Sequence, residues 1–411
     1  MIEDAIFHKL EEELLLKDIK LNSLLEITKS INNKTPVDSL VSIFTFILKE
    51  QLGFQKFVLF NKDEEWKCLV KEGYKGAVKN LDVEEELLRF KEITVIESSH
   101  VKVINDFDVI VPILHGNKAL AFLLIAGFGE QELKPSGSFA NLAFIQTLAN
   151  IIVVAIENRR LAKEELKQER ITKDLEVARE MQRLLFPSNL PSDKRIDLAA
   201  TYKSRHEVGG DYYDFIRISE DEFIVCIGDV SGKGIGAAML MASFQATLRT
   251  LISLGKLDLE YLIHALNDKV MQGAKGEKFI TFFIGIYNSK TRKFKYVNAG
   301  HNHPFVTNGR SSKTLDKGCI GLGMLEEIPF LELDEVEISS NSTLVLYTDG
   351  VVELENEEGE FFEMERLKKL IKNYYPLNME DLNNLLFSKL DEWRGQKDFV
   401  DDTAIFSCRI F

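Results

Sequence analysis

The stretch EFIVCIGDVSGKG, residues 222–234, decides the fold of the C-terminal part of this chain. Its run of apolar residues at 223–227 predicts a strand, which runs into a glycine-rich turn containing Asp229. A largely apolar segment, residues 237–253, then predicts a buried helix. Asp229 is therefore expected at the end of a strand, beside a turn that glycine allows to be tight.

The same arrangement, an aspartate next to an apolar strand, recurs in three other places. One aspartate follows its strand: TDG at 348–350 comes directly after LVLY at 344–347. In the other two places the aspartates come before the strand. Asp401-Asp402 precedes the strand expected at 403–410, and GGDYYD at 209–214 precedes the strand expected at 215–218. For any single motif an ordinary turn is the better explanation, since Asp-Gly and Gly-Asp are common turn signals. Four such motifs together indicate that several carboxylates meet in space.

Carboxylates that converge repel one another unless cations neutralise them. The motifs offer oxygen ligands without histidine or cysteine, which favours Mg²⁺ or Mn²⁺ over zinc. Gly232-Lys233-Gly234 lacks the spacing of a nucleotide-binding P-loop, and the preceding Val230 could offer its main-chain carbonyl to a cation. The sequence therefore predicts a site for Mg²⁺ or Mn²⁺ built from separate segments.

The composition limits the class of protein. With 411 residues and 45% hydrophobic content, the chain is long enough for two or three domains. The net charge of −14 argues against sequence-independent nucleic-acid binding, which requires Lys and Arg to displace counterions. The N-terminus has no basic region before an apolar stretch, and the apolar residues 109–128 are interrupted by HGNK at 115–118. We therefore expect a cytoplasmic protein without a membrane span.

The positions of the cysteines limit the chemistry that they could perform. Their scattered positions predict neither a zinc site nor disulfides: Cys68, Cys226, Cys319 and Cys408. A cysteine-dependent phosphatase would need a phosphate-binding arginine six positions after its nucleophile, and the residues six positions after Cys68, Cys226 and Cys319 are Tyr74, Gly232 and Leu325. The mechanism of a cysteine-dependent phosphatase is therefore not expected.

A long helix is predicted in the middle of the chain. Residues 138–186 contain neither glycine nor proline and are followed by Pro187, which predicts one helix or two nearly continuous ones. Charges dominate from 157 to 183, and the remaining apolar residues form an irregular seam: Leu161, Leu166, Ile171, Leu175, Ala178 and Met181. A single solvated helix and a dimeric coiled coil fit this seam equally well, because an unbroken heptad pattern is missing. We expect this helix to mark a domain boundary and to carry a signal between domains.

The residues before this helix predict a mixed α/β domain. Residues 21–54 predict two helices joined around Pro36, a strand follows at 57–60, and 109–114 and 119–125 predict a central hairpin. The segments LLEITKSINNKTPVDSLVSIFTFILKEQLGFQKFVLFNKD and VPILHGNKALAFLLIAGF resemble a GAF domain in their order and character. The resemblance implies a sensory or interaction role, through an unknown small ligand or through dimerisation. His100 and His115 are expected to be structural or solvated.

The C-terminal part resembles the metal-dependent type-2C protein phosphatases, in the bacterial SpoIIE/RsbU branch. The resemblance rests on EVAREMQRLLFP, GGDYYDF, GDVSGKGIGAAMLM, YVNAGHNHPFV, LYTDGVVELENEEGEFF and DDTAIF, which occur in the family's order from the long helix to the C-terminus. It implies a β-sandwich flanked by helices, with two Mn²⁺ or Mg²⁺ ions at one edge of the sandwich. It also implies a reaction in which the two ions activate a water that attacks phosphorus in line, without a covalent phosphoenzyme.

The resemblance assigns the site residues. Asp229 is similar to the carboxylate shared between the two ions, and Asp211 to its partner. The candidate metal ligands are Asp211, Asp229, the main-chain carbonyl of Val230, Asp349 and Asp401, with Asp402 as an alternative to Asp401. Lys233 stands where this branch usually has histidine, and we expect it to be a tolerated substitution rather than a phosphate ligand. In the NAGH segment at 298–301 we expect His301 to be structural support rather than a general acid.

These observations predict a chain of α+β and α/β class with four parts: an N-terminal helix at 1–20, a GAF-like α/β sensory domain at 21–157, a helical linker at 158–190 and a type-2C phosphatase domain at 191–411. We expect a protein serine/threonine phosphatase that acts on a phosphorylated signalling protein, of the STAS anti-anti-sigma type by resemblance. We also expect regulation by the GAF-like domain and a homodimer formed through the linker helix. The alternatives are a non-catalytic scaffold that binds partner proteins and a nucleotide cyclase; the spread of the aspartates over four motifs argues against the cyclase.

Overall fold

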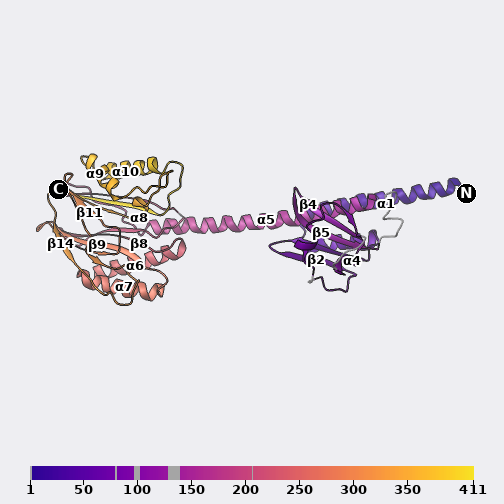
Figure 1. The fold of residues 1–411 in the computed structure, drawn as a ribbon, viewed down its shortest axis with the longest axis horizontal. Helices are drawn as coiled ribbons and strands as arrows, with labels where there is room; N and C mark the ends of the chain where they lie inside the picture. Colours follow the sequence, from indigo (N-terminus) through magenta and orange to yellow (C-terminus); the bar gives the residue numbers. More distant parts are fainter. Residues whose placement is uncertain (1, 79–80, 97–101, 128–138, 206) are drawn as a thin grey trace. The chain divides into compact units, whose positions relative to one another are not determined.

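The computed structural model describes residues 2–78, 81–96, 102–127, 139–205 and 207–411 (Figure 1). The chain forms two compact units, Met1–Glu169 and Arg170–Phe411. The boundary falls within helix α5 (Phe139–Arg183), which contributes residues to both units. The prediction of one long helix is confirmed, although Ser138 lies outside the described residues; its role as a linker stays a prediction.

The first unit is an antiparallel sheet covered by helices. The strand order is β2-β1-β5-β4-β3, so the predicted hairpin of β4 and β5 lies near the centre of the sheet. The mixed α/β character is confirmed, whereas the GAF assignment stays a prediction. The elements are α1 (Ile2–Asn32), α2 (Val37–Phe46), the π-helix η1 (Ile47–Gln51), β1 (Lys56–Lys62), β2 (Trp66–Glu72), α3 (Val83–Glu86), β3 (Thr94–Val95), α4 (Lys102–Asn105), β4 (Val109–His115) and β5 (Lys118–Ala126).

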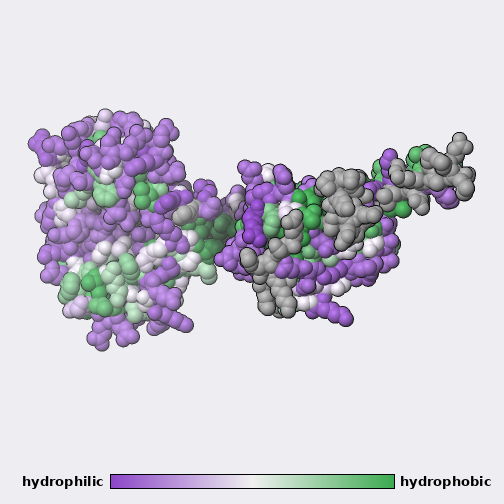
Figure 2. Space-filling model, turned by 45° about the vertical axis from the view of Figure 1, so that its right-hand side comes forward, coloured by the Kyte–Doolittle hydropathy of each residue, from purple (hydrophilic) through white to green (hydrophobic). Residues whose placement is uncertain are grey.

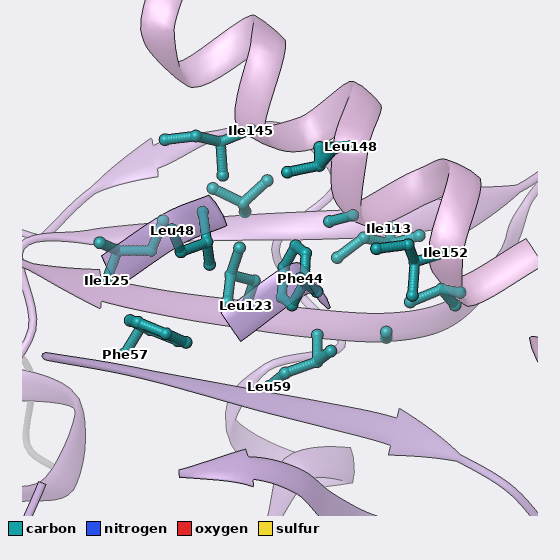
Figure 3. Close-up of a cluster of buried hydrophobic side chains, with 14 of the residues drawn as sticks. Phe44, Leu48, Phe57, Leu59, Ile113, Leu123, Ile125, Ile145, Leu148 and Ile152 are labelled. Atoms are coloured by element: carbon teal, nitrogen blue, oxygen red, sulfur yellow. The ribbon is translucent and has the colours of Figure 1, made fainter. Parts of the chain in front are cut away.

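The core of this unit lies between one face of the sheet and the first part of α5. Ile145, Leu148 and Ile152 of α5 pack on sheet residues such as Leu123 and Ile125 (Figure 3). These helix residues recur at spacings of three and four, which places them on one face of the helix. His115, at the end of β4, is exposed, and His100 lies outside the described residues.

Two helices are long and apolar enough, by length and composition, to cross a membrane: Asn141–Arg183 of α5 and Ile235–Ser253, which is α6. Some of the apolar residues of both helices take part in hydrophobic cores. Ile145 and Leu148 pack in the first unit, and Met241 and Phe244 pack in the second. This packing accounts for part of the hydropathy of the two helices, and the absence of a membrane span stays a prediction.

The second unit is a sandwich of two sheets with helices outside them (Figure 1). One sheet has the order β13-β10-β9-β8-β7 with β14 beside β10, and the other has the order β12-β11-β15-β16-β6. The elements are β6 (Ile196–Lys203), β7 (Tyr212–Arg217), β8 (Glu222–Val230), α6 (Ile235–Ser253), α7 (Leu259–Ala274), β9 (Ile280–Asn288), β10 (Lys293–Ala299), β11 (Phe305–Thr307), β12 (Ser312–Thr314), β13 (Gly318–Cys319), β14 (Asp334–Glu337), β15 (Ser342–Tyr347), α8 (Asp349–Val352), α9 (Met364–Asn373), α10 (Met379–Arg394) and β16 (Thr403–Ile410).

Burial on both faces explains why residues 223–227 of strand β8 are all apolar. Val225 and Ile227 face the core between the two sheets, whereas Ile224 and Cys226 face the core under α6 and α7. Successive side chains of a strand point to opposite faces, so a strand buried on both faces needs apolar residues at every position. A third core lies under α9 and α10, against the other sheet. The β-sandwich flanked by helices is thus confirmed.

The surface of the protein agrees with its composition. The face shown in Figure 2 is mostly hydrophilic, with smaller hydrophobic areas, as expected for a chain with a net charge of −14.

In the described residues the cysteines are free, and Cys226, Cys319 and Cys408 are buried. The expectation of unpaired cysteines therefore agrees with the structure.

Candidate metal centre

Asp211 and Asp229 lie close together because they belong to neighbouring strands. Asp211 directly precedes β7, whose first residue pairs with the residue before Asp229. At Gly210 the segment before β7 comes close to the end of β8. A Cβ atom on Gly210 would lie 2.9 Å from the Val230 carbonyl oxygen and 3.2 Å from Asp229 Oδ1. Glycine at this position therefore leaves space beside these two oxygens.

The second sheet supplies the other aspartates. Asp349 begins α8 just beyond β15, and Asp401 and Asp402 lie just before β16, the antiparallel neighbour of β15. The two segments are in close contact at Gly350: a Cβ atom on this residue would lie only 2.1 Å from the Asp402 carbonyl oxygen. Strand pairing thus brings the motifs around Asp349 and Asp401 to one end of this sheet.

Thr348 connects the two sheets at this edge. Its hydroxyl donates to Asp211 Oδ2 (2.8 Å) and accepts from the main-chain N–H of Ala404 (2.9 Å). Thr348 and Asp211 are both buried. Sequence reasoning missed Thr348; the available signal was its position directly before Asp349 in a strand-end motif.

The carboxylates of Asp401 and Asp402 have different surroundings. Both Asp402 oxygens accept main-chain N–H groups, Oδ1 from Arg205 and Oδ2 from Gly210, each at 2.8 Å. Asp401 is more exposed, and its Oδ2 lies 2.9 Å from the ammonium nitrogen of Lys233. Asp402 therefore fixes the loop before β7, whereas Asp401 faces a cationic side chain.

Burial and like charges raise the pKa values of three carboxyl groups. Burial, followed by the negative charges of Asp229 and Asp402, raises the pKa of Asp211 well above its ordinary value. Burial and then Asp349 raise the pKa of Asp229 to about 7, and burial and then Asp401 raise the pKa of Asp349 to about 6. Five of the six aspartates in the four motifs therefore lie within electrostatic reach of one another: Asp211, Asp229, Asp349, Asp401 and Asp402.

The donor set fits a hard divalent cation in its chemistry, since carboxylate and carbonyl oxygens are the ligands that Mg²⁺ and Mn²⁺ prefer. Asp211 Oδ1 is buried without a hydrogen-bond partner in the described part of the chain, an unfavourable arrangement that a cation would relieve. Among the described residues no three Asp, Glu, His or Cys side chains are grouped so that they could hold one ion.

Lys233 lies in the turn between β8 and α6. The turn reaches positive φ angles at Gly232 (+86°) and Gly234 (+74°), which glycine adopts without strain. Besides its ion pair with Asp401, the Lys233 ammonium donates to the Val400 carbonyl oxygen (3.2 Å). We expected Lys233 to be only a tolerated substitution for histidine. The structure adds that it contacts Asp401, a candidate metal ligand.

His301 is structural, as expected. It is buried, its Nδ1 lies 2.9 Å from the Thr281 hydroxyl oxygen, and its Nε2 lies 3.2 Å from the Tyr347 carbonyl oxygen. Burial lowers the pKa of His301 to about 4. A neutral imidazole with both ring nitrogens engaged supports the fold and is not placed to act as a general acid.

The end of α5 contacts the loop that carries Asp211. The Gln182 side-chain amide donates to the Gly209 carbonyl oxygen (2.7 Å) and accepts from the Gly209 N–H (3.2 Å). One turn earlier, Arg179 Nε donates to the Glu207 carbonyl oxygen (2.6 Å). Gln182 is buried. Sequence reasoning missed this contact, because a helix pattern does not show which residue meets a distant loop.

The fold of the second unit defines its class. The structure is similar to the SiaA-PP2C domain of Pseudomonas aeruginosa over 60% of this chain and 99% of that domain, with a TM-score of 0.54 and 19% sequence identity. The sandwich is therefore a PP2C phosphatase fold.

Sequence comparisons narrow this class. A family model described as stage II sporulation protein E (SpoIIE) matches residues 219–411, which include the candidate ligands from Asp229 onwards but not Asp211. The phosphoserine phosphatase RsbU of Bacillus subtilis is 28% identical over 239 residues, 57% of this chain and 70% of that protein. Protein IcfG of Synechocystis is 26% identical over 259 residues, 56% of this chain but 41% of that protein. The second unit thus has a PP2C-type fold, and most of it matches the SpoIIE family model.

Proposed function

We propose that this protein is a cytoplasmic, metal-dependent protein serine/threonine phosphatase. The observation that carries the proposal is the convergence of Asp211, Asp229, Asp349 and Asp401 at one edge of a PP2C-type sandwich, where burial and then neighbouring carboxylates raise the pKa values of the first three. The similarity to a phosphoserine phosphatase supports a phosphoserine or phosphothreonine side chain as the substrate group.

In this proposal the chain holds two Mn²⁺ or Mg²⁺ ions. When bound, such ions lower the pKa of water and neutralise charge on the phosphoryl group. Thr348 keeps Asp211 oriented toward the site, and Asp402 holds the loop before β7. Asp402 is the weaker ligand candidate, because both its carboxylate oxygens already accept main-chain N–H groups. The proposed ligands are Asp211, Asp229, the Val230 carbonyl, Asp349 and Asp401.

Phosphate release in the presence of Mn²⁺ tests this function, with p-nitrophenyl phosphate and a phosphoserine protein as substrates. We expect Asp229→Asn and Asp349→Asn to reduce kcat/KM by about 100-fold or more, since the proposed ions neutralise charge in the transition state. Asp221→Asn is the matched control, because Asp221 precedes the same strand β8 but pairs with Lys290. A wild-type protein that binds partner proteins but releases phosphate from neither substrate would support the scaffold alternative.

For the physiological substrate, we propose a phosphorylated STAS-type signalling protein, on the basis of the sequence resemblance to the SpoIIE/RsbU branch. A folded STAS protein should then have a higher kcat/KM than a short peptide with the same phosphoserine sequence. Equal values for both would contradict a STAS-specific enzyme without affecting the phosphatase assignment.

The first unit, in this proposal, is a GAF-like sensory domain that responds to an unknown small ligand and acts on the phosphatase through α5. Two observations support this: α5 contributes residues to both units, and its residue Gln182 is hydrogen-bonded to Gly209, two residues before Asp211. A displacement of the end of α5 would therefore displace the loop that carries a proposed ligand.

A further inference from the structure

The Lys233 ammonium lies against the carboxylate of a proposed metal ligand. Its Nζ is 2.9 Å from Asp401 Oδ2, and the two side chains are 42% and 38% exposed. The other oxygen, Asp401 Oδ1, accepts the main-chain N–H of Asp402 (2.9 Å). Both oxygens of this carboxylate are therefore engaged in the structure.

We propose that Lys233 competes with the divalent cation for Asp401 and thereby sets the metal concentration at which the site fills. This inference rests on the proposed function. An ammonium and a divalent cation on one carboxylate oxygen repel each other strongly at short range. Lys233 must therefore leave Asp401 Oδ2 before that oxygen can bind an ion.

The surroundings of Lys233 allow this exchange. Its side chain is partly exposed, so the ammonium can be hydrated when it leaves Asp401. The shape of the turn depends on the flanking residues Gly232 and Gly234, which adopt positive φ angles, rather than on the Lys233 side chain. The positive charge of Lys233 also acts on Asp349, where it opposes the effects that raise the pKa of that carboxyl group. The lysine therefore acts on two proposed ligands.

Lys278 offers a matched control beside the same turn. Its Nζ donates to the Ser231 carbonyl oxygen (3.0 Å), and a Cβ atom on Gly232 would lie 2.5 Å from that nitrogen. In the part of the chain that the structure describes, Lys278 has no ion pair with a carboxylate. It therefore contributes the same charge near the turn without engaging a proposed ligand.

Calorimetric titration of the full-length, chelator-treated protein with Mn²⁺ measures the competition directly. We expect Lys233→Met to bind Mn²⁺ about two- to fivefold more tightly than wild type, the range that corresponds to losing one partly exposed ion pair. Lys233→Arg, which keeps the charge, should stay near the wild-type affinity, and Lys278→Met should change it less than Lys233→Met does. The gain should shrink as ionic strength rises, because exposed charges are screened.

The Asp401→Asn background separates competition from a general charge effect. Lys233→Met should have no further effect there, because the shared carboxylate is absent. Equal Mn²⁺ affinities of wild type and Lys233→Met would overturn the inference, and so would an undiminished gain in the Asp401→Asn background. Absence of Mn²⁺ binding in wild type and in all variants would instead overturn the proposed function.

Discussion

Asp211 has a buried carboxylate that the protein alone does not satisfy. One oxygen accepts the Thr348 hydroxyl, and the other has no partner among the described residues. A buried polar group without a partner costs about 1–3 kcal/mol of folding free energy. Such a cost is consistent with a residue kept for binding rather than for stability. A bound cation would remove it and stabilise the folded state.

Replacing Thr348 by Val should lower phosphatase activity strongly while reducing the stability of the fold only moderately. The change removes the hydrogen bond to Asp211 and leaves the buried Ala404 N–H without its acceptor, which should cost about 1–3 kcal/mol of unfolding free energy. Because Asp211 loses its orientation, we expect phosphatase activity to fall about 10- to 100-fold, as for other residues that orient metal ligands. Urea unfolding and phosphate release measure the two effects.

Thr343→Val is the control for this experiment. Thr343 is buried on β15, the strand that Thr348 directly follows, and its hydroxyl accepts from Arg409 Nε (3.0 Å). It should lose comparable stability and keep its activity. Equal losses of activity in the two variants would contradict a specific role for Thr348.

At the scale of elements, local patterns predicted most of the strands and helices around the site. β16 has the predicted bounds, α6 begins at residue 235 rather than 237, and β8 extends beyond the predicted residue 227 to include Asp229 and Val230. The extension has a physical reason: β9 continues to pair with β8 through these residues. Hydrophobic patterns end at the first polar side chain, but strand pairing continues where the neighbour provides hydrogen bonds.

The contacts between elements could not be predicted from the sequence. The aspartates were recognised because each stands next to an apolar strand, yet Thr348, Gln182 and the ion pair of Lys233 with Asp401 were missed. The partners in these contacts are far apart in the sequence, and their meeting depends on strand register and helix docking. A local pattern contains no information about which distant segment lies opposite.

The contact between α5 and the Asp211 loop leads to a prediction. Gln182→Ala removes both hydrogen bonds to Gly209, and we expect the Mn²⁺ concentration for half-maximal activity to rise about tenfold, because the loop is no longer held. Glu180→Ala, at an exposed position on the same helix, is the control and should behave as wild type. Metal-dependence curves measured by phosphate release decide the matter, and identical curves for the two variants would speak against coupling through Gln182.

For the whole molecule, the open question from the sequence is whether the charged part of α5 associates with a second copy. Most of its seam residues are exposed in the single chain: Leu161, Leu166, Ile171 and Met181. Association with a second copy would cover such exposed apolar residues, and on this basis the homodimer stays a proposal beside the single solvated helix.

Charge placed in this seam should weaken the dimer. We expect wild type to be dimeric at micromolar concentration and the double variant Leu166→Glu, Ile171→Glu to be monomeric, because burying a carboxylate in an apolar seam is costly. Lys167→Glu introduces the same charge beside the seam and should leave the dimer intact. Light scattering coupled to size-exclusion chromatography gives the mass of each species. A monomeric wild type would leave the solvated helix as the correct description.

The position of β8 within its sheet has a consequence for the time scales of the site. β8 is hydrogen-bonded to β7 on one side and to β9 on the other, so its amide protons should exchange with solvent only in large opening events. Asp401 instead precedes its strand in an irregular segment, where small fluctuations suffice for exchange. An arriving ion would thus meet a rigid anchor at Asp229 and a partner at Asp401 that can rearrange in a much shorter time.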